Sequence, residues 1–297
     1  MPVARLDDRA VLHVAGEAAH GFLDGLITSD VDNAQPGKPI FAALLTPQGK
    51  ILFDFFLHVA PESEGGFLID CRRDMLPELT KRLKFYRLRA KVSLDERADD
   101  LAVIAGWGDA AAPKASLARG PDPRLQALGW RAIVHAGDAP AGDASGDDYK
   151  AHRMAHGMPE GGADYAFGET FPHEALMDHN GGVDFAKGCY VGQEVVSRMQ
   201  HRGTARTRVV PVQAVAGVLP GPGAEITAAG KVVGTCVSTA QGRAMAKLRL
   251  DRVADALEAG AALESGEARL ALIQPGWLGI TLPGVVAGAA GGLDNAG

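Results

Sequence analysis

The residue of this chain best suited to do chemistry is a cysteine inside the segment KGCYVGQE, Lys187 to Glu194. Gly188 and Gly192 permit backbone conformations closed to other residues and let a ligand approach the main chain. Helical spacing starts at Gln193, which places Cys189 in a tight loop just before a predicted helix. Free amide groups and the helix dipole favour a thiolate at such a position. The segment therefore predicts a reactive or ligand-facing thiol.

Charged residues around this loop add to that prediction, but a second interpretation stays open. Lys187 and, beyond one helical turn, Arg198 and Arg202 would contribute positive potential, and Glu194 can pair with Arg198 at i, i+4. An isolated cysteine is also often a small buried filler. That interpretation is favoured for Cys71 and Cys236, which stand in apolar, strand-like surroundings.

Other residues that could bind a metal, dock a partner or catalyse a reaction are less strongly indicated by the sequence. His152 and His156 have the spacing of two metal ligands on one helical face, but there is no third ligand, so surface histidines are favoured. The basic segment 72–91 is typical of a solvated helix face, or of a docking surface for an acidic ligand tail or RNA. Asp54 is expected on a strand beside His58 and could be catalytic, although a lone strand carboxylate is usually structural. No P-loop, G-x-G-x-x-G or Ser/His/Asp order is present.

Composition narrows the class of protein. The chain has 297 residues, a net charge of -6 and 46% hydrophobic residues, as expected for a globular protein of two or three domains. It offers no overall basic field for DNA, no apolar run of membrane length and no apparent signal peptide. Three cysteines without a C-x-x-C pair indicate a reducing compartment, so we expect a cytoplasmic location and no metal or cluster held by the chain's own cysteines.

The elements that must position Cys189 follow from the pattern of apolar residues. Residues 16–30 have helical spacing, Thr46 to Gly49 form a turn, and the alternation over 51–59 predicts a strand paired with a second strand after residue 66. Residues 72–89 predict a helix capped by Asp74, and the segments KVSL and LAVIAG predict strands. This order indicates an α+β sandwich.

The second half of the chain has a different character. The segments 108–123 and 136–148 are rich in Ala, Gly, Pro and Asp and are predicted to be surface excursions around a strand. A helix is expected from Asp147, ending at Gly157. From about residue 204, short strands separated by glycine turns predict a small β-barrel, followed by a flexible tail.

These motifs together resemble the YgfZ family of folate-binding proteins, relatives of the aminomethyltransferase (T-protein) of the glycine cleavage system. The signature KGCYVGQE, followed by VVSRMQHRG, is the strongest part of the resemblance. Further similar segments occur in the family's order over nearly the whole chain: FLDGLITSDV (22–31), LLTPQGKILFDFFL (44–57), RLKFYRLRAKV (82–92), VDFAKGCYVGQEVVSRMQHRG (183–203) and the stretch around GKVVGTCVS.

The resemblance implies an α+β fold of three domains in a ring around a tetrahydrofolate site. The implied domains are residues 1–45 with 148–203 (folate-binding), residues 46–147 (ferredoxin-like), a β-barrel at 204–283 and a flexible tail at 284–297. It further implies an accessory role, rather than catalysis, in assembling or maintaining [4Fe-4S] enzymes, including radical-SAM tRNA-modifying ones. Cys189 would be the functional thiol, with tetrahydrofolate or a one-carbon derivative bound by Lys187, Gly188, Tyr190, Gly192, Gln193, Glu194 and Arg198.

One departure from the family pattern affects the folate expectation. The family stretch that matches RMAHGMP (153–159) usually reads close to IEAGIP, and its glutamate corresponds to a pterin-binding carboxylate in the aminomethyltransferases. That position is Ala155 here, so pterin anchoring must come from another group, be weaker or be lost. Tyr86, Arg89 and Arg198 are of types suited to a folate ring or its acidic tail.

Three functions therefore stay open at the level of sequence. The first is a folate-binding accessory protein for [4Fe-4S] enzymes, with client enzymes or cluster carriers as partners and a monomeric chain. The second is a folate-dependent one-carbon transferase of the aminomethyltransferase type. The third is a thiol-containing module that binds RNA or protein without folate. No membrane or DNA partner is expected.

Overall fold

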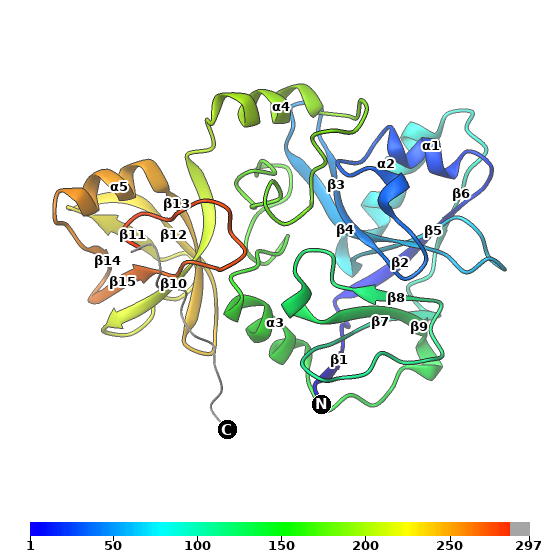
Figure 1. The fold of residues 1–297 in the computed structure, drawn as a ribbon, viewed down its shortest axis with the longest axis horizontal. Helices are drawn as coiled ribbons and strands as arrows, with labels where there is room; N and C mark the ends of the chain where they lie inside the picture. The colour runs from blue at the N-terminus through cyan, green and yellow to red at the C-terminus, as the bar shows by residue number, and fades with distance from the viewer. Residues whose placement is uncertain (286–297) are drawn as a thin grey trace. The chain divides into compact units, whose positions relative to one another are not determined.

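The structure is a computed structural model in which residues 1–285 are described (Figure 1). Its contacts divide the chain into two compact units. Unit 1 comprises Met1–Tyr149, Phe167–Pro172 and Asn180–Arg198, and unit 2 comprises Lys150–Ala166, His173–His179 and the chain from Met199 onward. The chain thus returns to unit 1 twice, the second time with the cysteine loop. The predicted tail at 284–297 lies, from residue 286 on, outside the described residues.

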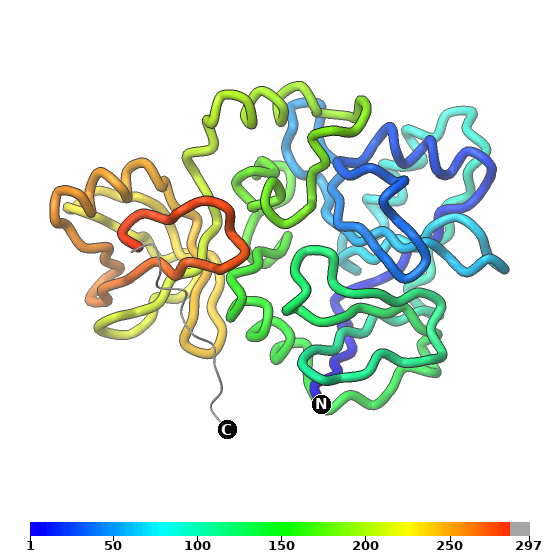
Figure 2. The backbone as a smooth tube through the Cα atoms, viewed as in Figure 1, coloured from blue at the N-terminus to red at the C-terminus, as the bar shows by residue number. Residues whose placement is uncertain are grey.

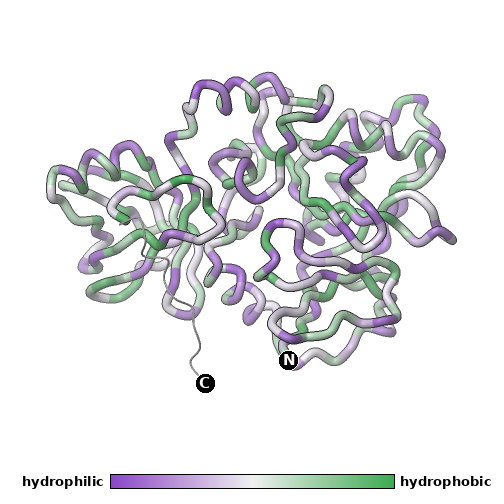
Figure 3. The backbone as a smooth tube through the Cα atoms, in the orientation of Figure 1, coloured by the Kyte–Doolittle hydropathy of each residue, from purple (hydrophilic) through white to green (hydrophobic). Residues whose placement is uncertain are grey.

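The first layer of unit 1 is a five-stranded antiparallel sheet that two helices cover. Its order is β3 (Ile40–Leu45), β4 (Ile51–Val59), β5 (Phe67–Arg72), β2 (Arg9–Ala15) and β6 (Ser93–Glu96). Buried side chains of α1 (Ala19–Asp24) and α2 (Leu76–Arg87) form one core with this sheet. In Figure 3 the segments of β3 and β4 are coloured mainly as hydrophobic, as expected for strands buried on both faces. The predicted strand 51–59, its hairpin partner and both helices are confirmed.

The predicted cap of α2 is wrong. Asp74 lies in a 3-10 turn, η2 (Arg73–Met75), and its carboxylate accepts hydrogen bonds from Arg72. Met75 occupies the cap position without a side-chain hydrogen bond, and Pro77 stands in the first turn as expected. The arginine two residues earlier competes for the carboxylate, because a bidentate pair is stronger than a neutral cap contact.

The second layer of unit 1 is a four-stranded sheet of order β1 (Val3–Arg5), β7 (Leu101–Gly106), β9 (Trp130–His135) and β8 (Ala118–Pro121). The prediction that 108–123 is a surface excursion is therefore wrong for its second half, since Ala118–Pro121 pairs with β9. Gly120 makes this strand possible, because a Cβ there would lie 2.3 Å from Pro39 Cδ. The second segment contains only η4 (Ala136–Asp138) before α3 begins at Gly146, and most of it is exposed.

Buried ion pairs join the two sheets of unit 1. Asp70 of β5 accepts hydrogen bonds from Arg9 of β2 and from Arg131 of β9, each at 2.6 Å, and all three side chains are almost fully buried. Arg131 also lies over the ring of Phe56, 4.0 Å from its centroid. These ion pairs lie beside an apolar cluster to which both sheets contribute, with Val11 and Leu68 from one sheet and Val103 and Ile133 from the other.

Unit 2 contains the predicted β-barrel, which is closed by six strands. Their order is β10 (Thr207–Ala216), β13 (Arg243–Arg249), β12 (Lys231–Ala240), β11 (Glu225–Ala228), β14 (Leu263–Ser265) and β15 (Ala268–Leu272), and β15 pairs with β10. Figure 2 follows this chain from yellow-green to orange-red. A helix that the sequence analysis omitted, α5 (Leu250–Glu258), packs Val253 into the barrel core.

The remaining elements of the described residues are two 3-10 turns and two helices. Short 3-10 turns η1 (Val31–Asn33) and η3 (Gln126–Leu128) precede β3 and β9, α3 spans Gly146–Ala155, and α4 spans Gln193–Arg202. The predicted boundary between residues 45 and 46 passes between β3 and β4, which pair with each other. The division into three domains at the predicted residues stays a prediction.

Candidate functional site

The thiol of Cys189 is exposed, on a loop of unit 1 that ends where α4 begins at Gln193. The other two cysteines, Cys71 and Cys236, are buried, as predicted. Burial raises the pKa of Cys71 to about 12, so this thiol stays protonated. Among the three cysteines, only Cys189 is therefore accessible to a partner or ligand.

Lys187 holds this loop in place rather than facing solvent. Its side chain is 1% exposed, and its ammonium group donates hydrogen bonds to the carbonyl oxygens of Asp24, Ile27 and Ser29 at 2.7, 2.9 and 3.2 Å. It also lies 3.0 Å from the Asp24 carboxylate. These four oxygens satisfy the ammonium group, so Lys187 acts as an internal tie between the loop and the end of α1.

Gly192 and Tyr190 also stabilise the conformation of the loop. Gly192 has φ +83°, and a Cβ there would lie 2.5 Å from the carbonyl oxygen of Thr46. The loop thus packs directly on the predicted turn at 46–49, where Gly49 has φ +81°. Tyr190 is buried, and burial together with the charge of Asp184 raises its pKa to about 12. These residues fix the path of the backbone on either side of Cys189.

The other signature residues lie nearer to solvent. Gln193 donates a hydrogen bond to the carbonyl oxygen of Gly188 at 3.3 Å, which closes the loop onto the start of α4. Glu194 and Arg198 form the predicted i, i+4 pair at 2.5 Å, and both side chains are exposed. Much of α4 is coloured as hydrophilic in Figure 3. Gly188, Cys189, Glu194 and Arg198 are thus the exposed members of the signature.

A cavity of about 640 Å³ lies in unit 1, and residues 181 and 183–185, at the N-terminal end of the loop that carries Cys189, form part of its wall. None of the predicted cofactor-binding residues lines it. Its walls come from η1, β3, the segments after β8 and the start of the loop: Ser29, Asn33, Lys38, Pro39, Ile40, Phe41, Pro121, Asp122, Pro123, Gln126, Gly181, Val183, Asp184 and Phe185. Spacing and composition did not predict these residues as part of a site, although VDF at 183–185 belongs to the same family segment as the signature.

The polar groups of this cavity differ in their availability. Burial alone would raise the pKa of Asp122, but Arg124, with two bonds to this carboxylate, keeps it below its usual range. Asp184 accepts hydrogen bonds from the amide of Ala186 at 2.8 Å and from Asn33 at 3.3 Å. Lys38 is exposed on the wall of the cavity. The site therefore combines flat apolar walls with two carboxylates and one ammonium group.

Residues that the sequence analysis considered elsewhere lie apart from this cavity's walls. Asp54 is buried at 4% exposure on β4. His152 lies on α3 and His156 directly follows its last residue, with the two ring centroids 4.9 Å apart. Within residues 1–285 no cluster of three or more His, Cys, Asp or Glu side chains could hold a metal ion. Within the same range no helix is long and apolar enough to span a bilayer.

Comparison with known proteins identifies the family. Residues 206–280 match the model of the CAF17 C-terminal beta-barrel domain. The iron–sulfur cluster assembly factor IBA57, mitochondrial, of Homo sapiens is 32% identical over 304 residues, which cover 92% of this chain and 84% of that protein. The protein of the same name from Mus musculus is 35% identical, with 77% of this chain and 72% of that protein covered. The chain belongs to the IBA57 family.

This assignment confirms the resemblance to the YgfZ family. A fungal IBA57 homologue from Mycosarcoma maydis is 34% identical over 71% of this chain, but the chain spans only 56% of its length. The expectation of a cytoplasmic location is wrong, because the IBA57 relatives are mitochondrial proteins. The cysteine content that led to it indicates a reducing compartment but does not say which one.

The fold of the IBA57 family member described here is that of the aminomethyltransferases. The crystal structure of the glycine cleavage system aminomethyltransferase T from Bartonella henselae aligns with a TM-score of 0.71, over 93% of this chain and 85% of that one. At 15% identity this similarity concerns the fold alone. The predicted fold class, a GcvT-like α+β fold with a small C-terminal barrel, is thereby confirmed.

Proposed function

We propose that this chain is an iron–sulfur cluster assembly factor that binds a reduced folate and presents the thiol of Cys189 to a partner. The observation that supports this most directly is an exposed thiol on a rigidly tied loop whose first residues line a cavity. The names of the IBA57 relatives support the assembly role. The clients would be [4Fe-4S] enzymes, including tRNA-modifying radical-SAM enzymes, or the carriers that supply them.

Cys189 alone can supply one thiolate ligand to iron. On binding it would release its proton to solvent, and the other ligands would have to come from the partner or from small thiols. Because Lys187 and Gly192 hold the backbone on both sides, the thiol is presented with little loss of conformational entropy.

The chemistry of the cavity fits a folate. A pterin ring is flat and needs apolar walls, which Phe41 and the prolines provide. Its guanidine-like edge needs a carboxylate, and since position 155 is alanine and Asp122 is already paired with Arg124, Asp184 would take that role. Lys38 would meet the acidic glutamate tail. A bound folate would supply one-carbon or redox chemistry, while the chain's own residues would bind and orient it.

The assembly role is tested in cells that lack the chain's own gene. Cys189→Ala is expected to abolish the recovery of [4Fe-4S] enzyme activities that the unchanged chain provides. The exposed position predicts that the variant folds with unchanged stability. Cys236→Ala is the matched control, a buried cysteine that should leave the recovery intact. Full recovery with Cys189→Ala would refute the role of the thiol.

Folate binding is tested separately by calorimetric titration of the purified chain with tetrahydrofolate. We expect micromolar binding that weakens about tenfold in Lys38→Ala, because a charge-assisted contact to the tail contributes about 1.5 kcal/mol. Lys114→Ala, another exposed lysine of unit 1 outside the cavity wall, should bind as the unchanged chain does. No binding at millimolar tetrahydrofolate would contradict this part of the proposal.

A further inference from the structure

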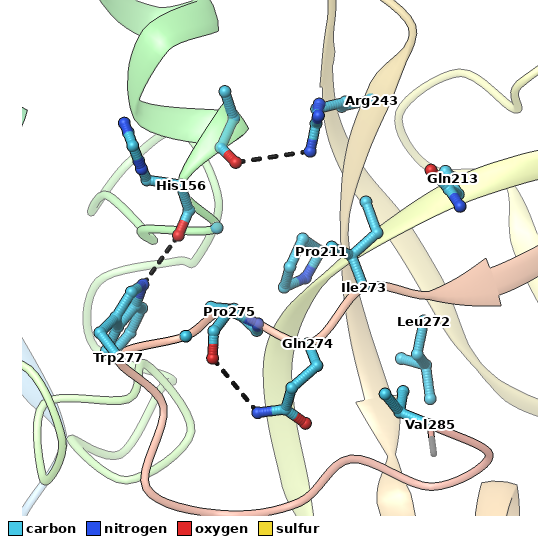
Figure 4. A pocket seen from close by; sticks show the side chains of 13 residues that line it. His156, Pro211, Gln213, Arg243, Leu272, Ile273, Gln274, Pro275, Trp277 and Val285 are labelled. Atoms are coloured by element: carbon cyan, nitrogen blue, oxygen red, sulfur yellow. Dashed lines mark hydrogen bonds between the residues drawn. The ribbon is translucent and has the colours of Figure 1, made fainter. Parts of the chain in front are cut away.

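A second cavity, of about 360 Å³, lies entirely within unit 2 and has no part in the proposed function (Figure 4). It is formed by the end of α3, strands β10 and β13, and the chain that continues from β15. Its volume is at the small end of the range of ligand sites. The apolar walls are Pro211, Leu272, Ile273, Pro275, Trp277 and Val285, and the polar side chains are His156, Gln213, Arg243 and Gln274.

Arg243 is the cation of this cavity. Figure 4 shows its guanidinium group directed toward the end of α3, where it donates one long hydrogen bond, of 3.4 Å, to the carbonyl oxygen of Ala155. Within the described residues no carboxylate forms an ion pair with it. Four further N–H donors of the guanidinium group are available to a ligand.

The positive charge of this cavity comes from Arg243 alone. Burial, together with the charge of Arg243, lowers the pKa of His156, so its imidazole is neutral near pH 7. A half-buried cation among apolar walls loses hydration without gaining a counter-ion, which favours an incoming anion. A guanidinium group binds carboxylate and phosphate oxygens in the same forked geometry.

Contacts within the chain hold the walls of the cavity in place without a bound ligand. The indole N–H of Trp277 donates to the carbonyl oxygen of His156 at 2.8 Å, which fixes the ring at the edge of the cavity. The side-chain amide of Gln274 bonds four backbone groups between Pro275 and Leu282, at 2.8 to 3.5 Å. A Cβ at Gly157 would lie 2.8 Å from both Pro211 and Pro275, so this glycine lets the end of α3 lie against the two prolines.

From these contacts we propose that the cavity of unit 2 binds a small ligand with a terminal oxyanion, a carboxylate or a phosphate. Arg243 would hold the oxyanion, and a flat or apolar body would lie along Trp277 and the two prolines. The ordered loop at 274–282 means that little entropy is lost on binding. Because no residue of this cavity belongs to the folate cavity or to the Cys189 loop, the site can exist whether or not the proposed function is correct.

The test uses the full-length chain and three probes of one shape: benzoate, phenyl phosphate and uncharged benzamide. The indole N–H signal of Trp277 is followed by nuclear magnetic resonance and assigned with Trp277→Phe. Benzoate, phenyl phosphate or both should shift it saturably, and benzamide should bind at least tenfold more weakly. A preference between the two anions tells whether the site takes a carboxylate or a phosphate. Equal binding of benzamide, or no shift with either anion at 10 mM, which is about tenfold above a millimolar Kd, would overturn the proposal.

Arg243→Met provides an independent comparison. It keeps the length of the side chain, removes the charge, and should weaken binding of the preferred anion at least tenfold. Arg252→Met, on the exposed face of α5 in the same unit, is the matched control and should bind as the unchanged chain does. Circular dichroism checks that both variants fold. Unchanged anion binding in a folded Arg243→Met variant would also overturn the proposal.

Discussion

His58 is a buried, titratable side chain of β4, and within residues 1–285 its Nε2 has no hydrogen-bond partner. Burial lowers its pKa to about 4, with the charge of Asp70 opposing this shift and that of Arg131 adding to it. The unfolded chain therefore binds more protons than the folded chain below pH 6.5. We predict that the free energy of unfolding falls by on the order of 3 kcal/mol between pH 6.5 and pH 4 from this residue.

Urea unfolding of His58→Leu at several pH values measures this contribution. The variant cannot titrate at this position, so its stability should depend less on pH over that interval. His135→Leu, at the exposed end of β9, should keep the pH dependence of the unchanged chain. Identical pH slopes for His58→Leu and the unchanged chain would show that the imidazole is not held neutral by burial.

The environment of Lys187 could not be predicted from its residue type and its neighbours in the sequence. Its neighbours in the signature indicated a positive group near a ligand, whereas its ammonium group is bonded to three carbonyl oxygens. Those oxygens come from residues about 160 positions earlier, so local spacing could not reveal them. Cys189 could be predicted as a loop residue because glycines and a helix start are local signals, but its exposure depends on the packing of the whole unit.

Single elements were predictable where the periodicity was strong. The strand at 51–59 and the helices at 76–87 and 193–202 follow directly from their apolar patterns. The strand Ala118–Pro121 was missed because its residues lack β-propensity, and it is stabilised by pairing with β9 and by the fit of Gly120 against Pro39. The helix Leu250–Glu258 was missed although Leu250, Val253 and Leu257 have helical spacing.

The turn after α2 contains a strained residue whose replacement should stabilise the chain. Leu88 has φ 45° and ψ -106°, as at the first central position of a type II′ turn, and the amide of Ala90 donates to Arg87 at 2.7 Å. Its side chain is 88% exposed, so little packing is lost on removing it. Relief of strain outweighs the added freedom of the unfolded chain, and Leu88→Gly should raise the free energy of unfolding by about 1 kcal/mol.

The matched control for this turn is Phe85→Gly, one turn earlier in α2. Phe85 is also exposed, at 72%, but it has helical geometry, so glycine should destabilise the chain by about 1 kcal/mol there. The midpoints of urea denaturation compare the two variants. If Leu88→Gly were destabilised as much as Phe85→Gly, the turn would not be strained in solution.

At the scale of the whole molecule, unit 1 depends on the ion pairs between its two sheets. The sequence could not predict them, because Arg9, Asp70 and Arg131 are 61 positions apart from one to the next and each alone reads as a surface residue. The same contacts join Arg9, which lies before the predicted boundary at residues 45 and 46, to Asp70 and Arg131, which lie after it. Strands β2 and β9, which start at residues 9 and 130, thus share one buried carboxylate.

Replacing that carboxylate tests whether the two sheets unfold together. Asp70→Asn leaves two buried guanidinium groups without their counter-ion and should lower the free energy of unfolding by about 3 to 5 kcal/mol. The exposed pair between Asp143 and the N-terminus is the control, and Asp143→Asn should leave the free energy of unfolding nearly unchanged, because solvent screens an exposed pair. Unfolding is followed by fluorescence in a Trp277→Phe background, in which Trp107 and Trp130 report on unit 1 alone.

The same carboxylate predicts a dependence of stability on pH. Burial raises the pKa of Asp70, but the charges of Arg131 and Arg9 lower this pKa by more, so the folded chain holds the group ionised below pH 4. The unchanged chain should then lose stability as the pH falls below about 4, and Asp70→Asn should lose less. A loss below 1 kcal/mol in Asp70→Asn, with the acid sensitivity retained, would mean that packing and not this carboxylate holds the sheets together.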